Sequence, residues 1–134
     1  MFITPCKIEV LKNGKVRLLQ PLEFRHKNIL ITLYNGFIWD LASIPSYLTS
    51  IVGCPFDYVM ESALHDALYS TGLFDRETSD FYWYLALRSG GSYKNSVDKP
   101  LAKTLHAGVR VGGASHFKDG SIADAREFVG IEVL

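Results

Sequence analysis

Hydrophobic and polar residues alternate along the first third of the chain, a pattern typical of β-strands with one solvent-facing side. The alternation is interrupted by Asn13-Gly14 and Asn35-Gly36. Such pairs favour tight turns, because asparagine and glycine tolerate positive φ angles, and at Asn13-Gly14 we expect a hairpin turn of type I′. A similar alternation returns near the C-terminus. The strands predicted are residues 7–11, 15–19, 29–33, 37–39 and 127–133.

The middle of the chain has the apolar spacing of amphipathic helices. Asp57 and Asp75 are suitable N-cap residues, and Pro100 suits the first turn of a helix. The helices predicted are residues 58–70, 76–89 and about 99–111. A short turn separates the first two, so they should form an antiparallel helix hairpin. We therefore predict an α+β fold, in which a small antiparallel sheet, completed by a returning C-terminal strand, packs with a three-helix region.

Composition favours one globular domain over residues 1–134, since 48% of the residues are hydrophobic and 21% are charged. The 14 basic and 14 acidic residues cancel, so we expect no nucleic-acid partner. No apolar run approaches the roughly 20 residues that a membrane helix needs, and the N-terminus lacks a secretory signal pattern. We expect a soluble protein without a membrane span or signal peptide. Cys6 and Cys54 are expected to be reduced thiols.

Side chains of catalytic type are concentrated in three motifs. The motifs are Gly-Phe-Ile-Trp-Asp-Leu-Ala-Ser-Ile-Pro at 36–45, His-Asp-Ala-Leu-Tyr at 65–69 and Arg-Glu-Thr-Ser-Asp-Phe at 76–81. His65 and Asp80 lie at similar distances from the turn of the helix hairpin, so we expect them at the same height on facing helices. His65 shares a helix face with Tyr69, and Arg76 shares one with Asp80. The hairpin therefore predicts a cluster of imidazole, phenol and carboxylate.

Such a cluster could activate a water molecule. A carboxylate bonded to one imidazole nitrogen leaves the other nitrogen as an acceptor, which makes His65 a general base, with Asp80 orienting it and Tyr69 steadying Asp80. Asp66 points in a different direction. With carbonyl oxygens from the loop around Asp40, it could hold Ca²⁺ or another hard divalent cation.

Each of these residues also has a structural interpretation. The cluster could be a satisfied polar layer between helices, with Arg76 and Asp80 as an ordinary helical ion pair. Asp40 and Ser43 could cap a turn or a short helix, and for Ser43 we favour capping, because no Gly-x-Ser-x-Gly motif surrounds it. The remaining histidines show no zinc-ligand spacing; they are His26, expected at the surface, His106, expected in the core or near the cluster, and His116.

Together, the three motifs resemble a family of short phage and prophage proteins that is catalogued as a domain of unknown function. The resemblance covers about residues 30–112. It implies a bacteriophage or prophage origin, and members of that family are often labelled as phage structural or tail-associated proteins.

The helix pair alone is similar to the centre of secreted phospholipase A2 enzymes, through His65-Asp66-x-x-Tyr69 and the later Asp80. The resemblance implies that His65 is the base, that Asp66 binds calcium, and that Asp80 orients His65 with support from Tyr69. The disulfides and the Gly- and Cys-rich calcium loop of those enzymes are absent from this sequence.

Three functions follow as hypotheses. The first is a small hydrolase acting on an ester or amide of the host envelope, which predicts a solvent-open cleft at His65. The second is a virion or tail component that contacts other virion proteins, which predicts that His65, Asp66 and Asp80 are buried and bonded to one another. The third is a phage protein that binds a host factor. We expect the protein in the host cytoplasm after phage expression or assembled into the virion.

Overall fold

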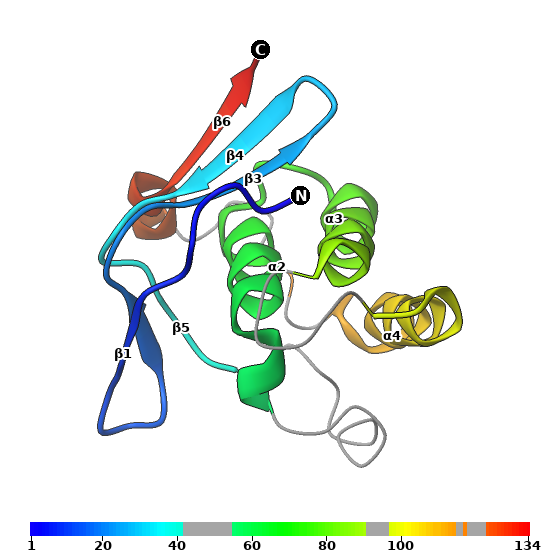
Figure 1. The fold of residues 1–134 in the computed structure, drawn as a ribbon, viewed down its shortest axis with the longest axis horizontal. Helices are drawn as coiled ribbons and strands as arrows, with labels where there is room; N and C mark the ends of the chain where they lie inside the picture. Colours follow the sequence, from blue (N-terminus) through cyan, green and yellow to red (C-terminus); the bar gives the residue numbers. More distant parts are fainter. Residues whose placement is uncertain (42–54, 91–96, 115–116, 118–122) are drawn as a thin grey trace.

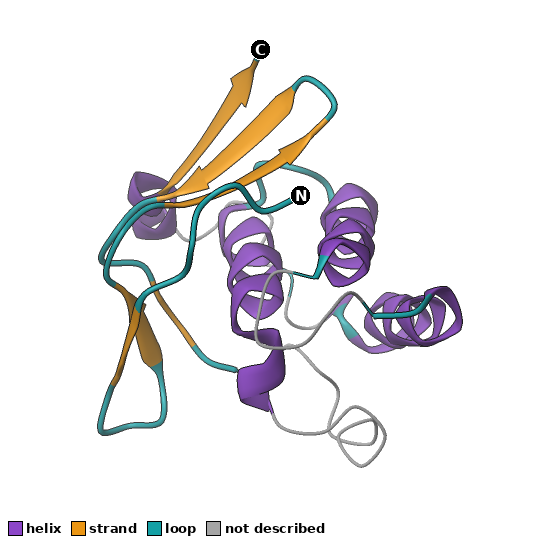
Figure 2. Ribbon diagram, viewed as in Figure 1, coloured by secondary structure: helices purple, strands orange, loops and turns teal. Residues whose placement is uncertain are grey.

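The computed structural model describes residues 1–41, 55–90, 97–114, 117 and 123–134, whose strands and helices are shown in Figures 1 and 2. Two antiparallel three-stranded sheets lie in this part of the chain. The first sheet contains, in spatial order, β1 (Ile8–Val10), β2 (Val16–Leu18) and β5 (Ile38–Trp39). The second contains β3 (Leu22–His26), β4 (Ile29–Leu33) and β6 (Val129–Val133). The helices are α2 (Val59–Thr71), α3 (Arg76–Ser89) and α4 (Lys99–Gly112), with short 3-10 helices at Pro55–Tyr58 and Ala123–Phe128.

The α+β class predicted from the sequence is confirmed, but the strands form two sheets where one was expected. The strand that the prediction missed is β3, whose Leu22 and Phe24 are buried in the alternating pattern of a strand. It is joined to β4 through Lys27 and Asn28, and Lys27 has a φ angle of 52°. Lysine seldom adopts positive φ, so the sequence gives no turn signal at this position.

The first hairpin turn also differs from the prediction. Val10 pairs with Val16, and the Leu11 amide donates to the Lys15 carbonyl at 2.8 Å, so three residues form the loop. Gly14 has a φ angle of 81°, whereas Asn13 does not have a positive φ. A type I′ turn needs positive φ at both central residues, so this loop is instead the three-residue kind that ends in a left-handed glycine.

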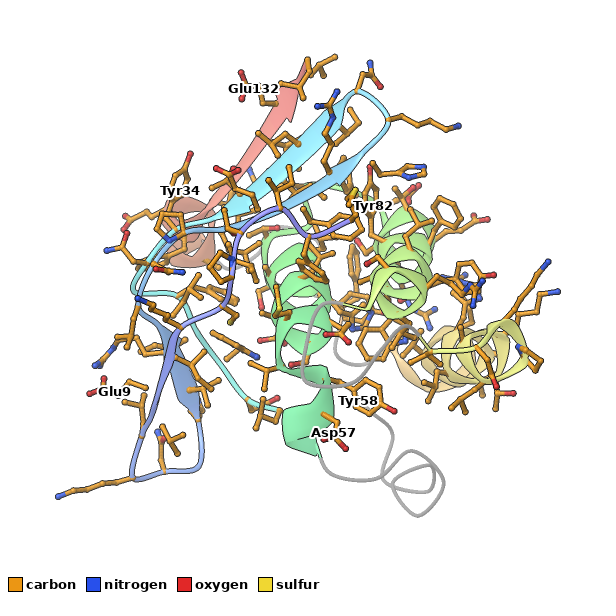
Figure 3. The ribbon with its side chains drawn as sticks, viewed as in Figure 1. Glu9, Tyr34, Asp57, Tyr58, Tyr82 and Glu132 are labelled. Carbon is orange, nitrogen blue, oxygen red and sulfur yellow. The ribbon has the colours of Figure 1, made fainter. Side chains whose placement is uncertain are left out.

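Helices α2 and α3 pack beneath the β3-β4-β6 sheet, and α4 lies on the far side of α3 from α2 (Figure 1). Tyr82 lies between α3 and this sheet in Figure 3, with its ring stacked on Phe74 at 5.3 Å and in an edge-to-face contact with Phe24 at 6.1 Å. A larger core joins both sheets to α2 and α3. A second core between α3 and α4 consists of Tyr58, Trp83, Leu87, Val97, Ala102, Leu105 and Val109.

Capping explains most of the helix boundaries. The Asp75 side chain accepts from the Thr78 amide at 2.7 Å, as the sequence predicts, and Asp98 does the same for Leu101 at 3.0 Å. The expected N-cap at Asp57 is wrong: α2 begins after Tyr58, whose side chain makes no capping hydrogen bond. A 3-10 turn runs directly into α2, and therefore no separate side-chain cap is needed there.

Cys6 is a free thiol, whereas Cys54 lies outside the described residues. Among the helices that the structure describes, none has both the length and the apolar character needed to cross a membrane.

Replacing Gly36 with alanine should destabilise the fold more than the same change at Gly14. Both glycines have positive φ, at 97° and 81°, so alanine is strained at either position by about 1–2 kcal/mol. At Gly36 a new Cβ would also lie 3.0 Å from the Phe128 ring, whereas at Gly14 it meets nothing within 4 Å. Chemical denaturation should give the larger loss for Gly36→Ala. Equal losses would mean that Phe128 moves aside without cost.

Candidate active site

The turn between α2 and α3 fixes the alignment of the two helices. Gly72 adopts the left-handed conformation that ends α2, and its amide donates to the Leu68 carbonyl. Asp75 then caps α3. This short connection sets His65 of α2 opposite Asp80 of α3, with His65 Nε2 3.0 Å from Asp80 Oδ1.

Asp80 is the centre of the cluster, and its side chain is fully buried. The Tyr69 hydroxyl donates to the same Oδ1 atom at 2.5 Å, and Arg110 Nη1 donates to Oδ2 at 2.9 Å. Burial alone raises the pKa of Asp80, but the hydrogen bonds from His65, Tyr69 and Arg110 outweigh it, so the pKa lies below its usual value. The buried carboxylate is therefore ionised and accepts hydrogen bonds from α2 and α4.

Arg76 supports this arrangement from the start of α3. Its Nε atom is 3.9 Å from Oδ2 of Asp80, the helical ion pair that the sequence suggested. Its Nη2 atom donates to the backbone carbonyls of Val109 and Arg110, at 2.8 and 2.5 Å. These carbonyls lie in the last turn of α4, where cations are favoured. Arg76 therefore ties the beginning of α3 to the end of α4.

His65 is held in one orientation by Asp80. An ionised carboxylate can only accept, so Nε2 carries the proton and Nδ1 is left as the acceptor. Burial lowers the pKa of His65, and this effect exceeds the opposing influence of Asp80. The imidazole is therefore neutral at pH 7, with its basic nitrogen directed away from the carboxylate.

Aromatic rings surround the imidazole. The Tyr69 and Trp83 rings lie 4.1 and 5.2 Å from the His65 ring, measured between centroids, and Phe117 contacts Tyr69 at 5.3 Å. Gly113 lies against the Tyr69 hydroxyl so closely that an added Cβ would be 2.5 Å away. The side of His65 that faces these rings is apolar, and only 5% of the residue is exposed. The expectation of a solvent-open cleft at His65 is therefore wrong, because the described residues bury the imidazole.

Asp66 does not belong to this cluster. Burial and the negative charge of Asp40 raise the pKa of Asp66 to about 7, while Lys15 opposes the shift. Asp40 is held near α2 because the neighbouring Trp39 donates its indole N–H to Ser62 at 3.1 Å. Within the described ranges, no group of three or more His, Cys, Asp or Glu side chains could hold a metal ion.

Two sequence assignments remain, Ser43 and His106. Ser43 lies outside the described residues. His106, which the sequence placed in the core or near the cluster, packs its ring against Tyr84 at 6.0 Å, and it lies close enough to His65 to help lower the pKa of that imidazole. Conversely, the sequence reasoning did not identify Arg110 or Trp83. Arg110 lies 30 residues beyond Asp80, on a helix whose position against α3 cannot be predicted from a local pattern. Trp83 could have been identified, because its spacing of three residues from Asp80 puts both on the same face of α3.

The imidazole of His65 should be observed as the Nε2–H tautomer at neutral pH. Long-range ¹H–¹⁵N spectra resolve the two ring nitrogens, and a titration should give a midpoint below 6.5, because burial disfavours the charged ring. An Nδ1–H tautomer would contradict the geometry at Asp80, and a midpoint above 6.5 would show that the effect of Asp80 exceeds that of burial.

Asp66 should make the protein less stable as the pH rises from about 4 to 7. The folded protein keeps the Asp66 proton up to about pH 7, whereas the unfolded chain releases it near the ordinary value of 3.8. The folded state therefore binds more protons in this range, and its stability falls with increasing pH, by at most about 4 kcal/mol. Asp66→Asn should remove this loss in urea denaturation at pH 5 and pH 8. If the change in stability between pH 5 and pH 8 is the same in the wild-type protein and in Asp66→Asn, the raised pKa of Asp66 is refuted.

Comparison with protein-family models places this chain in a family. No curated protein and no solved structure matches the chain. The model of the family described as "Protein of unknown function (DUF1353)" matches residues 16–109. The matched region runs from β2 to within a few residues of the end of α4, and it includes His65, Tyr69 and Asp80. The chain therefore belongs to the DUF1353 family of proteins of unknown function.

Proposed function

We propose that this chain is a hydrolase of bacteriophage or prophage origin, with His65 as the general base that activates water. The bond between Asp80 and Nε2 of His65 carries the proposal, because it orients the ring and leaves Nδ1 as the proton acceptor. The phage origin is supported by the three sequence motifs. The substrate class we propose is an ester or amide of the host envelope, including phospholipid esters.

The reaction is an addition of water to a carbonyl group. As the water oxygen attacks the carbonyl carbon, its proton moves to Nδ1 of His65 and the carbonyl π electrons move onto oxygen. The tetrahedral intermediate then collapses, and the imidazolium returns the proton to the leaving oxygen or nitrogen. Asp80 stabilises the imidazolium that forms between these steps, because its charge lies 3.0 Å from Nε2.

The other members of the cluster act on Asp80. Tyr69 and Arg110 hold the two carboxylate oxygens, and Arg76 holds the end of α4 in register. The hydrogen bonds of Tyr69 and Arg110, together with that of His65, keep Asp80 ionised inside the protein. A neutral Asp80 could no longer stabilise the protonated imidazole of His65. Tyr69, Arg110 and Arg76 therefore act on the base through Asp80, and they do not touch the substrate.

Asp66 is the residue that would hold a hard cation, although no group of three ligating side chains surrounds it among the described residues. Burial and repulsion from Asp40 raise the pKa of Asp66, and a bound cation such as Ca²⁺ would relieve both effects. Carbonyl oxygens and water would have to complete its coordination. The comparison of the wild-type protein with Asp66→Asn also tests for this cation. Ca²⁺ should raise the melting temperature of the wild-type protein at pH 8 and should not raise that of the variant.

A virion or tail component is the second candidate, and the burial of the cluster favours it. Asp80 is fully buried, only 5% of His65 is exposed, and the hydrogen-bond donors to Asp80 come from α2 and α4, with Arg76 of α3 at ion-pair distance. An internal brace has these properties without any chemistry. Its partners would be other virion proteins, and mass spectrometry of purified virions would detect the chain.

His65→Gln should separate the two functions. The glutamine amide can still donate to Asp80 near the position of Nε2, but it has no basic nitrogen. For a hydrolase, turnover should fall by about 10²–10⁴-fold while the melting temperature changes little. The assay would use phospholipid vesicles, fatty-acid esters and peptidoglycan as substrates.

Tyr69→Phe is the matched control, because it removes one bond to Asp80 and leaves the base intact. It should reduce stability by about 1–3 kcal/mol and lower turnover less than His65→Gln does. If His65→Gln retains full turnover, or no substrate is hydrolysed by the wild-type protein, the hydrolase proposal fails and the brace remains.

A further inference from the structure

Trp83 is a buried residue with an unused hydrogen-bond donor. Its side chain is fully buried in the second core, and its indole Nε1 atom has no acceptor in the described part of the protein. Buried tryptophan N–H groups usually have a partner, since an unpaired donor away from water destabilises the folded state. The exception at Trp83 therefore calls for an explanation.

The position of Trp83 links this donor to the candidate active site. Its ring lies 5.2 Å from the His65 ring, with 41° between the two planes. Trp83 is also three residues after Asp80 on α3, so both side chains lie on the same side of the helix. One small molecule in contact with the imidazole would therefore be within reach of the indole.

We propose that the indole N–H of Trp83 binds the ligand of this site, donating a hydrogen bond to a carbonyl oxygen. The inference rests on the proposed function and adds the group that positions the substrate. The ligand class is an ester or amide whose apolar portion suits the rings around His65. A donor aimed at that oxygen binds it more strongly as negative charge develops there.

Trp39 provides an internal comparison. Only 2% of it is exposed, so it is buried almost as completely as Trp83. Its indole N–H, however, donates to Ser62 Oγ at 3.1 Å. The chain contains two tryptophans, so the same chemical change can be made once at a bonded N–H and once at an unbonded one.

The first measurement is stability. Benzothienylalanine replaces the indole N–H by sulfur and keeps the shape of the side chain, and it can be incorporated at either position. At Trp39 it should lower the melting temperature by about 3–6 °C, because Ser62 loses its donor. At Trp83 the melting temperature should stay the same or rise. An equal fall at both positions would show that the Trp83 N–H is already bonded, which would overturn the proposal.

The second measurement is ligand binding, with hexanamide as the probe. In ¹H–¹⁵N spectra of the wild-type protein, the Trp83 indole resonance should shift on titration while the Trp39 resonance stays in place. Benzothienylalanine at Trp83 should weaken hexanamide binding by about three- to tenfold, and at Trp39 it should not. No shift at Trp83, or unchanged affinity in its variant, would overturn the inference.

These readouts do not depend on turnover. If the protein binds hexanamide through Trp83 but hydrolyses no substrate, the proposed hydrolase function is refuted and the role of Trp83 as a ligand-binding group stands. A protein whose turnover requires His65, but whose hexanamide affinity is unchanged by the substitution at Trp83, would refute only the inference about Trp83.

Discussion

One buried negative charge organises the helical part of this protein. Asp80 has no exposed surface, and its two oxygens receive His65 and Tyr69 from α2 and Arg110 from α4. An ionised carboxylate is expensive to remove from water, so the fold depends on these donors being in place together. Removing one partner of a buried ion pair typically costs about 3–5 kcal/mol. The relative positions of α2, α3 and α4 are therefore coupled through a single side chain.

The part of this cluster that lies on the helix hairpin could be predicted from the sequence. A helical repeat and a short turn are enough to bring His65, Tyr69 and Asp80 together, because all three lie within a few turns of Gly72. Arg110 could not be assigned in the same way. Its contact with Asp80 depends on how α4 docks against α3, and docking is decided by the packing of Trp83, Leu87 and Leu105 in the second core.

The sheets show the same division between local and distant interactions. The hairpin around Asn13-Gly14 was predicted, although its loop has one residue more than a type I′ turn. The division of the strands into two sheets was not predicted, because it depends on the direction that the chain takes after β4. The Gly36 amide donates to the Leu18 carbonyl, which directs β5 toward β2 and away from β4. No local periodicity encodes that choice of partner.

Stability alone is a weak reason for the chain to have this cluster. Well-packed apolar side chains often replace a buried ion pair without loss of stability. A functional role therefore explains the charges around Asp80 better than stability does. A pure brace would also be expected to satisfy its polar atoms. Asp80 is satisfied, yet the imidazole it orients has a second nitrogen aimed elsewhere, and the adjacent Trp83 N–H has no acceptor within the described residues. The acceptor belongs to the ring that Asp80 orients, and the donor belongs to the ring packed against it at 5.2 Å. Activating a water molecule beside a carbonyl group needs one group of each kind.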